Sequence, residues 1–111
     1  MDALAAARQV IEECDREMAA LFEKRMAAAK DIAFCKKERG LPVYVPEREA
    51  WLLEKNSALI SDPAVRAYYG EFLRQIMDVS KRYQQELISG GQDTEDGPAE
   101  CKRPGEKEVT Q

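Results

Sequence analysis

The stretch from residue 2 to residue 39 contains neither proline nor glycine, and this constrains the fold more than any other feature. It consists mainly of Ala, Glu, Lys, Arg, Met and Leu, which are all good helix formers. We predict one continuous helix, ended by Gly40 and Pro42. At 1.5 Å per residue its length is roughly 57 Å, whereas a compact domain of about 88 residues has a radius of gyration of only about 12 Å. Such a helix needs a second chain to cover it.

Apolar residues recur along this stretch in alternating steps of three and four, the spacing of a heptad seam. The seam positions are Leu4, Ala7, Ile11, Cys14, Met18, Leu21, Arg25, Ala28, Ile32 and Cys35. We therefore expect an intertwined helical homodimer in which two seams cross or run antiparallel.

Two further helices follow, so the predicted fold class is all-α with three helices per chain. Pro46 opens a short helix over residues 46–60, since proline is favoured in the first turn. Asp62 and Pro63 form an N-cap and first-turn pair for a long helix that ends at "SGG". The apolar face expected for that helix comprises Tyr69, Phe72, Leu73, Ile76, Ser80, Tyr83 and Leu87.

The C-terminal residues differ in composition from the rest. Residues 89–111 have almost no apolar side chains, and they carry six acids against three bases, which is −3 of the net charge of −4. We expect residues 1–88 to form the domain and residues 89–111 to be a disordered polar tail.

Composition excludes several classes of function. The chain has no histidine, which removes Ser-His and Cys-His nucleophile pairs and the usual zinc sites. Three cysteines without a C-x-x-C spacing argue against a disulfide framework. Cys14 and Cys35 lie roughly 30 Å apart on one helix, too far to pair, and are expected to be small core residues. The acidic balance argues against a nucleic-acid partner. Neither a signal peptide nor a membrane span is apparent, so we expect a cytoplasmic protein.

Four polar residues occupy positions where apolar ones are expected. Arg25 lies within the seam, and Lys36 follows eleven residues later, on the same line roughly 16 Å further on. Two cations in line on a face that should be buried suggest an anion between them, because unpaired buried charge is costly. Ser80 and Gln84 form a similar pair on the last helix. Arg25 could instead extend to solvent or pair with a glutamate, Ser80 could bond the preceding turn, and Gln84 could be an ordinary surface residue.

Together these residues resemble the all-helical AroQ class of chorismate mutases over residues 4–88. The matching pattern is Arg8, Arg25 in "FEKRMAAAKDIAFCKKERG", Lys36, "PVYVPERE" with Arg48 and Glu49, and "IMDVSKRYQQ" with Ser80 and Gln84. The resemblance implies conversion of chorismate to prephenate, the branch step towards phenylalanine and tyrosine. That reaction is an intramolecular Claisen rearrangement that needs no metal and no cofactor.

The resemblance also implies how the substrate carboxylates are held. Arg25 and Arg8 of the second chain in the homodimer would bind them, with Arg48 supporting this clamp and Ser80 assisting. Arginine suits this role because its planar fork binds carboxylates bidentately.

The remaining roles concern the ether oxygen and the ring hydroxyl. By resemblance, Lys36 and Gln84 would hydrogen-bond the ether oxygen as the C–O bond breaks, and Glu49 would accept the hydroxyl. Some relatives have Asp where this chain has Val45, which could serve through its backbone N–H. Because Gln84 donates at any pH, no requirement for acid pH is expected.

Three alternatives stay open. An isochorismate-pyruvate lyase of the same fold would use a similar cationic pocket, although Glu49 and Ser80 favour the mutase. A non-catalytic helical dimerisation module would suit the seam but not Arg25 within it. The third is a weak mutase activated by a partner enzyme.

Overall fold

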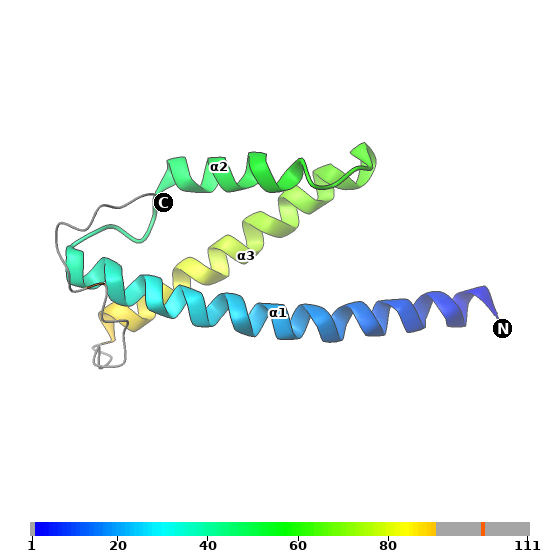
Figure 1. Cartoon of the computed structure of the whole chain (residues 1–111), viewed down its shortest axis with the longest axis horizontal. Helices are drawn as coiled ribbons and strands as arrows, with labels where there is room; N and C mark the ends of the chain where they lie inside the picture. The colour runs from blue at the N-terminus through cyan, green and yellow to red at the C-terminus, as the bar shows by residue number, and fades with distance from the viewer. Residues whose placement is uncertain (1, 91–100, 102–111) are drawn as a thin grey trace.

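The computed structural model describes residues 2–90 and Cys101. It contains α1 (Ala3–Arg39), α2 (Pro46–Ser57) and α3 (Pro63–Ser89), and the described residues include no strand, so the all-α prediction is confirmed. α1 and α3 run in the same direction, and α2, which connects them in the sequence, runs in the opposite direction (Figure 1). No helix within the described part of the chain has an apolar stretch long enough to cross a membrane.

The predicted limits of α1 are confirmed by its caps. The Asp2 carboxylate accepts a hydrogen bond from the backbone N–H of Ala5 at 3.2 Å. Gly40 adopts a left-handed conformation with φ +67°, which glycine reaches without steric cost. The N–H of Leu41 then donates to the carbonyl of Lys36 at 2.8 Å, so the chain turns away from the helix immediately.

α2 ends at Ser57, and the prediction that it reaches residue 60 is wrong. The N–H of Leu59 donates to Asn56 and that of Ile60 to Ser57, each three residues back. Hydrogen bonds to the carbonyl three residues back form tight turns, whereas an α-helix continues through bonds to the carbonyl four residues back. The start of α3 is as predicted, because the Asp62 carboxylate accepts from the N–H of Ala64 at 3.0 Å.

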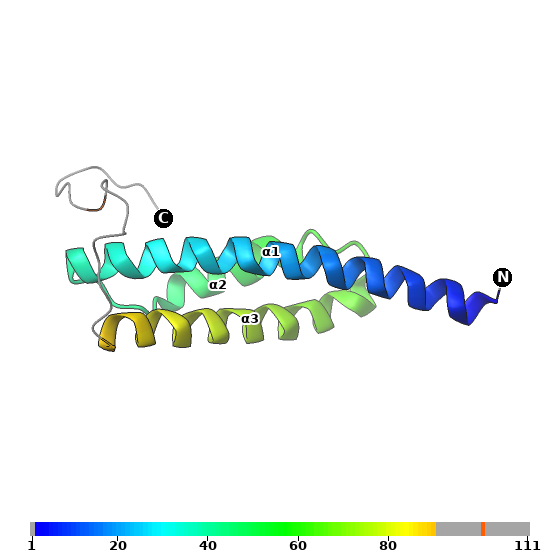
Figure 2. The same ribbon diagram turned by 90° about the horizontal axis from the view of Figure 1, so that it is seen from below.

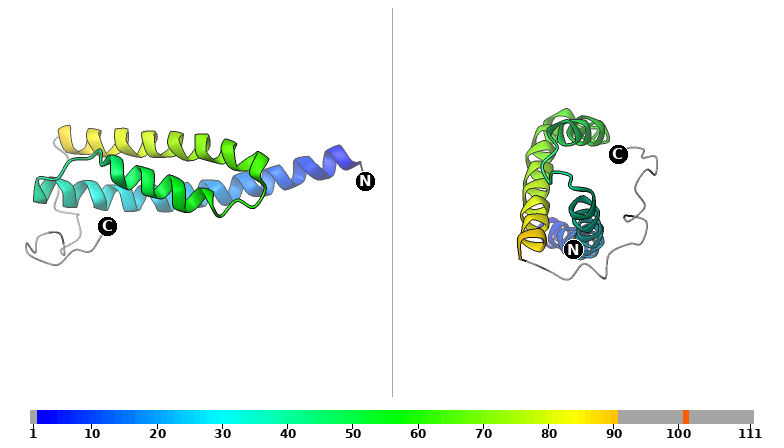
Figure 3. Two further views of the ribbon diagram at one scale, coloured as in Figure 1. Left: turned by 90° about the horizontal axis from the view of Figure 1, so that it is seen from above. Right: turned by 90° about the vertical axis from the view of Figure 1, so that its left-hand side faces the viewer.

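Both α1 and α2 pack against α3, and within the described residues they do not pack against each other. Seen end-on, the three helices form an open C with α3 as its back (Figure 3). The core is small, and its buried residues lie on the C-terminal half of α1 and the middle of α3, two helices that run side by side (Figure 2). Ala29 and Ala33 of α1 are buried, and so are Leu73 and Met77 of α3, the helix against which α1 packs. The predicted apolar face of α3 is partly wrong, because it omitted Met77 and included Phe72, which is 48% exposed.

The N-terminal half of α1 is not covered by any other described residue of its chain and extends beyond α2 and α3 (Figures 1 and 2). Its large apolar side chains are exposed, namely Leu4, Val10, Ile11, Met18, Leu21 and Phe22. Further along, Ile32 of the seam is also exposed, while Ala29 and Ala33 are buried. α3 therefore occupies the face beside the heptad seam, and the seam positions stay exposed among the described residues except Arg25 and Cys35, which are half-buried. The longest dimension of the chain is 57 Å. The homodimer remains a prediction.

The cysteines differ from the expectation. Cys35 is disulfide-bonded to Cys101, whereas Cys14 is a free and exposed thiol on the uncovered half of α1. The prediction that Cys14 and Cys35 are simply small core residues is therefore wrong. The distance between Cys14 and Cys35 along the helix excluded a disulfide between these two residues, but it did not bear on a disulfide with Cys101. Apart from Ser89, Gly90 and Cys101, the tail predicted over residues 89–111 lies outside the described residues.

Candidate active site

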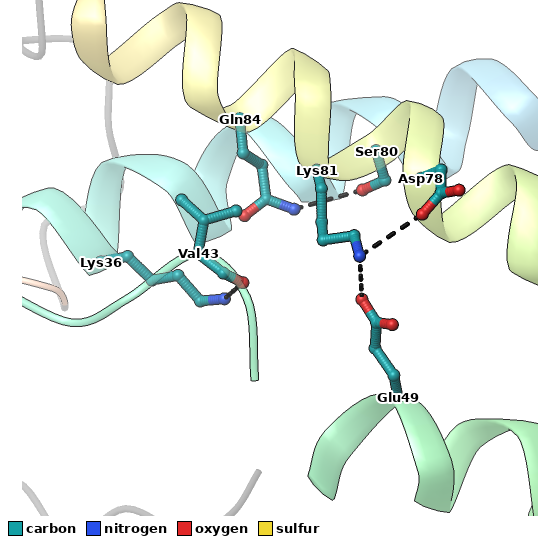
Figure 4. Close-up of polar contacts among 7 residues, drawn as sticks. All are labelled: Lys36, Val43, Glu49, Asp78, Ser80, Lys81 and Gln84. Atoms are coloured by element: carbon teal, nitrogen blue, oxygen red, sulfur yellow. Dashed lines mark hydrogen bonds and ion pairs between the residues drawn. The ribbon is translucent and has the colours of Figure 1, made fainter. Parts of the chain in front are cut away.

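Four of the eight predicted site residues lie where the C-terminal halves of α1 and α3 approach the start of α2 (Figure 4). The left-handed turn at Gly40 and the short link over residues 41–45 return the chain to this point. As a result Lys36 from α1, Glu49 from α2, and Ser80 and Gln84 from α3 surround one region.

Lys36 is half-buried, and its ammonium donates a hydrogen bond to the carbonyl oxygen of Val43 in the link at 2.8 Å. Burial is the main cause that lowers the pKa of Lys36 below its ordinary value of 10.5, and the positive charge of Arg48 lowers it further. The carboxylate of Glu49 opposes this shift without cancelling it. An ammonium kept in a partly desolvated place beside another cation is stabilised by any anion that enters.

Ser80 and Gln84 are both buried, each with 6% of its surface exposed. The side-chain amide nitrogen of Gln84 donates to the Ser80 hydroxyl oxygen at 3.2 Å. The amide oxygen of Gln84 is also buried, and it has no hydrogen-bond partner among the described residues. A buried polar atom left in this state costs about 1–3 kcal/mol. Rotating the amide by 180° would let Ser80 donate to that oxygen and would free the NH₂ group to donate elsewhere.

Glu49 forms an ion pair with Lys81 of α3, with 2.9 Å between the carboxylate oxygen Oε2 and Nζ. Lys81 also approaches Asp78 at 3.4 Å and lies 4.4 Å from the centre of the Tyr44 ring. The hydrogen bond to Glu49 raises the pKa of Lys81 above its ordinary value. Lys81 thus connects α3 to the first turn of α2 through Glu49 (Figure 4) and to the link through Tyr44.

The three predicted arginines are not gathered at this point. Arg48 is exposed, and its guanidinium lies 4.8 Å from the centre of the Trp51 ring, although its charge still reaches Lys36. Arg25 is half-buried on α1, about three turns before Lys36. It makes neither a hydrogen bond nor an ion pair within the described residues. Arg8 is exposed on the uncovered half of α1.

Val45 is half-buried and occupies the N-cap position of α2, where its side chain makes no capping bond. Its carbonyl oxygen accepts from the N–H groups of Arg48 and Glu49, which orients the first turn of the helix.

Sequence reasoning missed Lys81, Tyr44 and the carbonyl of Val43. A signal for Lys81 was present, because it lies three residues before Gln84 and four after Met77, on the same side of α3. The contacts of Tyr44 and Val43 depend on how the link folds, and no local pattern shows that.

All of these residues lie in a stretch that matches a known family. The family model described as "Chorismate mutase type II" covers residues 7–85. This chain belongs to that family. A T-protein of Haemophilus influenzae is 36% identical over 80 residues, which are 68% of this chain but only 21% of that protein. A chorismate mutase of Methanocaldococcus jannaschii is 31% identical over 77 residues, covering 69% of this chain and 78% of the relative.

A T-protein of Enterobacter agglomerans is 40% identical over 50 residues, or 45% of this chain and 13% of the relative. The chain thus spans about a fifth or less of these two T-proteins but most of the archaeal relative. No solved structure matches this chain.

Proposed function

We propose that this chain is a chorismate mutase, an isomerase of aromatic amino acid biosynthesis that converts chorismate to prephenate. Membership in the family supports this activity. The observation that carries the proposal is that half-buried Lys36 and buried Ser80 and Gln84 lie around one region, where the amide oxygen of Gln84 has no partner among the described residues.

The reaction requires only that the substrate is positioned and that its developing charge is stabilised. Chorismate must be held in a folded conformer, and negative charge that grows on its ether oxygen must be stabilised. The ammonium of Lys36 supplies a fixed positive charge for that oxygen. The amide of Gln84, rotated so that Ser80 donates to its carbonyl, supplies a second donor that is independent of pH.

Chorismate is a dianion, so its two carboxylates need cations. Arg25 is half-buried and has no hydrogen-bond or ion-pair partner in the described part of the chain, which suits its guanidinium to this role. Arg48 can turn from its stacked position on Trp51 towards the site, since exposed stacking of this kind contributes only about 0.5–1 kcal/mol. In this arrangement Ser80 has no proton left for a carboxylate, because its hydroxyl donates to Gln84, so its part is to orient that amide. On α2, Glu49 would accept the ring hydroxyl.

Arg8 can reach such a site only from a second chain. It precedes Arg25 by 17 positions, or roughly 25 Å along the helix axis. The uncovered half of α1 exposes a row of large apolar side chains, which a partner must bury. We propose that the uncovered half of α1 lies in the groove between α2 and α3 of the partner chain. That groove is lined by Ala50, Leu53, Glu54, Ser57, Ala58, Pro63, Arg66, Ala67, Gly70, Glu71 and Arg74.

The function is tested by supplying chorismate and isochorismate separately to the purified protein and measuring each product. We expect prephenate from chorismate and no pyruvate from isochorismate. Arg25→Ala should lower kcat/KM about 100- to 1000-fold, the usual effect of losing one fixed charge-stabilising group. Arg39→Ala, which removes an exposed arginine from the same helix, serves as the control. Release of pyruvate from isochorismate would identify the lyase instead, and turnover of neither substrate would refute the proposal.

The shared site is tested by mixing inactive variants. Arg8→Ala and Lys36→Ala chains, after subunit exchange, should recover about a quarter of the wild-type activity, because half of the dimers then contain one intact site of two. Lys36→Ala mixed with Gln84→Ala should recover none, since both residues come from the same chain in every site. Equal recovery in the two mixtures would contradict the arrangement.

A further inference from the structure

Lys81 is a cation at the site that the reaction described above does not use. Its ammonium lies 2.9 Å from Oε2 of Glu49 and 4.4 Å from the centre of the Tyr44 ring. The side chains of Lys81 and Glu49 are 25% and 23% exposed, so the pair is partly shielded from water. Asp78, the other carboxylate in reach, is farther away at 3.4 Å and its side chain is 61% exposed. Glu49 is therefore the principal partner of Lys81.

Glu49 presents an electrostatic difficulty if the substrate is a dianion. A third negative charge in the same region would repel the substrate, and that repulsion is strong where water is partly excluded. A carboxylate without a fixed partner would also rotate freely, so that hydroxyl recognition would require ordering it each time. An ammonium bonded to one carboxylate oxygen removes both difficulties, because it offsets the charge and holds the group in one orientation.

We propose that Lys81 is a positioning residue that holds Glu49 through Oε2, so that Oε1 is presented to the hydroxyl of the substrate. This inference rests on the proposed function. Lys81 also packs over Tyr44, and it thereby fixes the link and the first turn of α2 against α3 while the carboxylate is held. Its effect falls on binding of a hydroxylated dianion, since the hydroxyl contact exists before and during the rearrangement.

The experiment compares Lys81→Met, which keeps the length of the side chain without its charge, with Lys81→Arg, which keeps the charge. Arg82→Met is the matched control, because it removes one positive charge from the neighbouring exposed position of the same helix. With chorismate, Lys81→Met should lower kcat/KM about three- to tenfold, the range expected for losing a charge-assisted hydrogen bond that is partly screened by solvent. The change should appear mainly in KM, and Lys81→Arg should restore most of it.

The same substitution in a Glu49→Gln background shows whether Lys81 acts through Glu49. There Lys81→Met should change kcat/KM less than twofold, since the carboxylate that it holds is gone. A loss in this background as large as in the wild type would mean that Lys81 contacts the substrate directly, which would overturn the inference.

Two further outcomes separate this inference from the proposed function. An active wild-type enzyme whose Lys81→Met and Arg82→Met variants have equal KM and kcat would overturn the inference alone. A lower melting temperature of Lys81→Met with unchanged KM would do the same, because that is the signature of a merely structural ion pair. A wild-type protein that does not convert chorismate would overturn both.

Discussion

Lys36 gives the sharpest prediction, because its protonation can be followed through the pH dependence of the rate. Its burial and the nearby charge of Arg48 hold the pKa below 10.5 in the ligand-free protein. Only the ammonium form can stabilise the ether oxygen. We therefore expect kcat/KM for chorismate to fall about tenfold per pH unit above a midpoint that lies below 10.5.

Bound substrate should move this midpoint upward. One anionic oxygen about 4 Å from the ammonium contributes at most about 4 kcal/mol at an effective dielectric constant of about 20, or roughly three pKa units. We expect the alkaline midpoint of kcat to exceed that of kcat/KM by at least about one unit, since solvent screens part of this interaction. Both profiles come from steady-state rates of prephenate formation between pH 6 and 11.

Deprotonation of Lys36 does not unfold the protein, so unfolding caused by this residue cannot explain the alkaline fall in kcat/KM. Between its lowered folded pKa and 10.5 the unfolded chain binds more protons at this residue than the folded chain, so its contribution to the free energy of unfolding rises with pH. Lys81 acts in the opposite direction, because its pKa is raised: its contribution to the free energy of unfolding is present below pH 10.5 and is lost as pH rises from 10.5 to the raised value. Circular dichroism at each pH checks that the chain remains folded.

The control is Lys36→Arg, which keeps a positive charge across the whole range. Its residual activity should lack the alkaline decline below pH 10.5. A decline that persists unchanged in this variant would refute the assignment to Lys36, as would a wild-type kcat/KM that stays level to beyond pH 10.5.

Three further predictions concern single residues. Gln84→Glu should make the rate fall from pH 5 to pH 8, because a carboxyl must be protonated to donate, while the wild-type rate stays nearly level; a level profile in the variant would contradict the donor role. Val45→Asn should cap α2 and raise the free energy of unfolding by about 1 kcal/mol, or the melting temperature by about 4–8 °C, and no rise in a thermal scan would contradict the capping argument. Protein purified without reductant should show one reactive thiol on denaturation, that of Cys14, and three after reduction of the Cys35–Cys101 bond. Three thiols before reduction would contradict that pairing.

Features set by neighbouring residues were predictable from the sequence. The length of α1 and its end at Gly40 follow from helix propensity and from the left-handed turn that glycine permits. The start of α3 follows from the Asp62–Pro63 pair. The end of α2 was not predictable in this way, because residues 58–60 have no strong breaker and turn through bonds to carbonyls three residues back.

The site was only partly predictable, since its contacts join segments that are distant in the sequence. The periodicity of α3 placed Ser80 among its apolar residues, but it could not distinguish Phe72, which is exposed, from Met77, which is buried. The partner of Glu49 depends on how the link folds, so Lys81 was missed. The pairing of Cys35 with Cys101 spans 66 positions and leaves no periodic signal.

The central claim is that the region around Lys36 carries out the rearrangement of chorismate, and it is tested most directly by two substitutions at adjacent lysines. Lys36 is half-buried and bonded to the link, while Lys37 is exposed. We predict that kcat/KM for prephenate formation is about 100- to 1000-fold lower in Lys36→Ala than in Lys37→Ala, with both variants folded. Equal rates in the two variants would contradict the account.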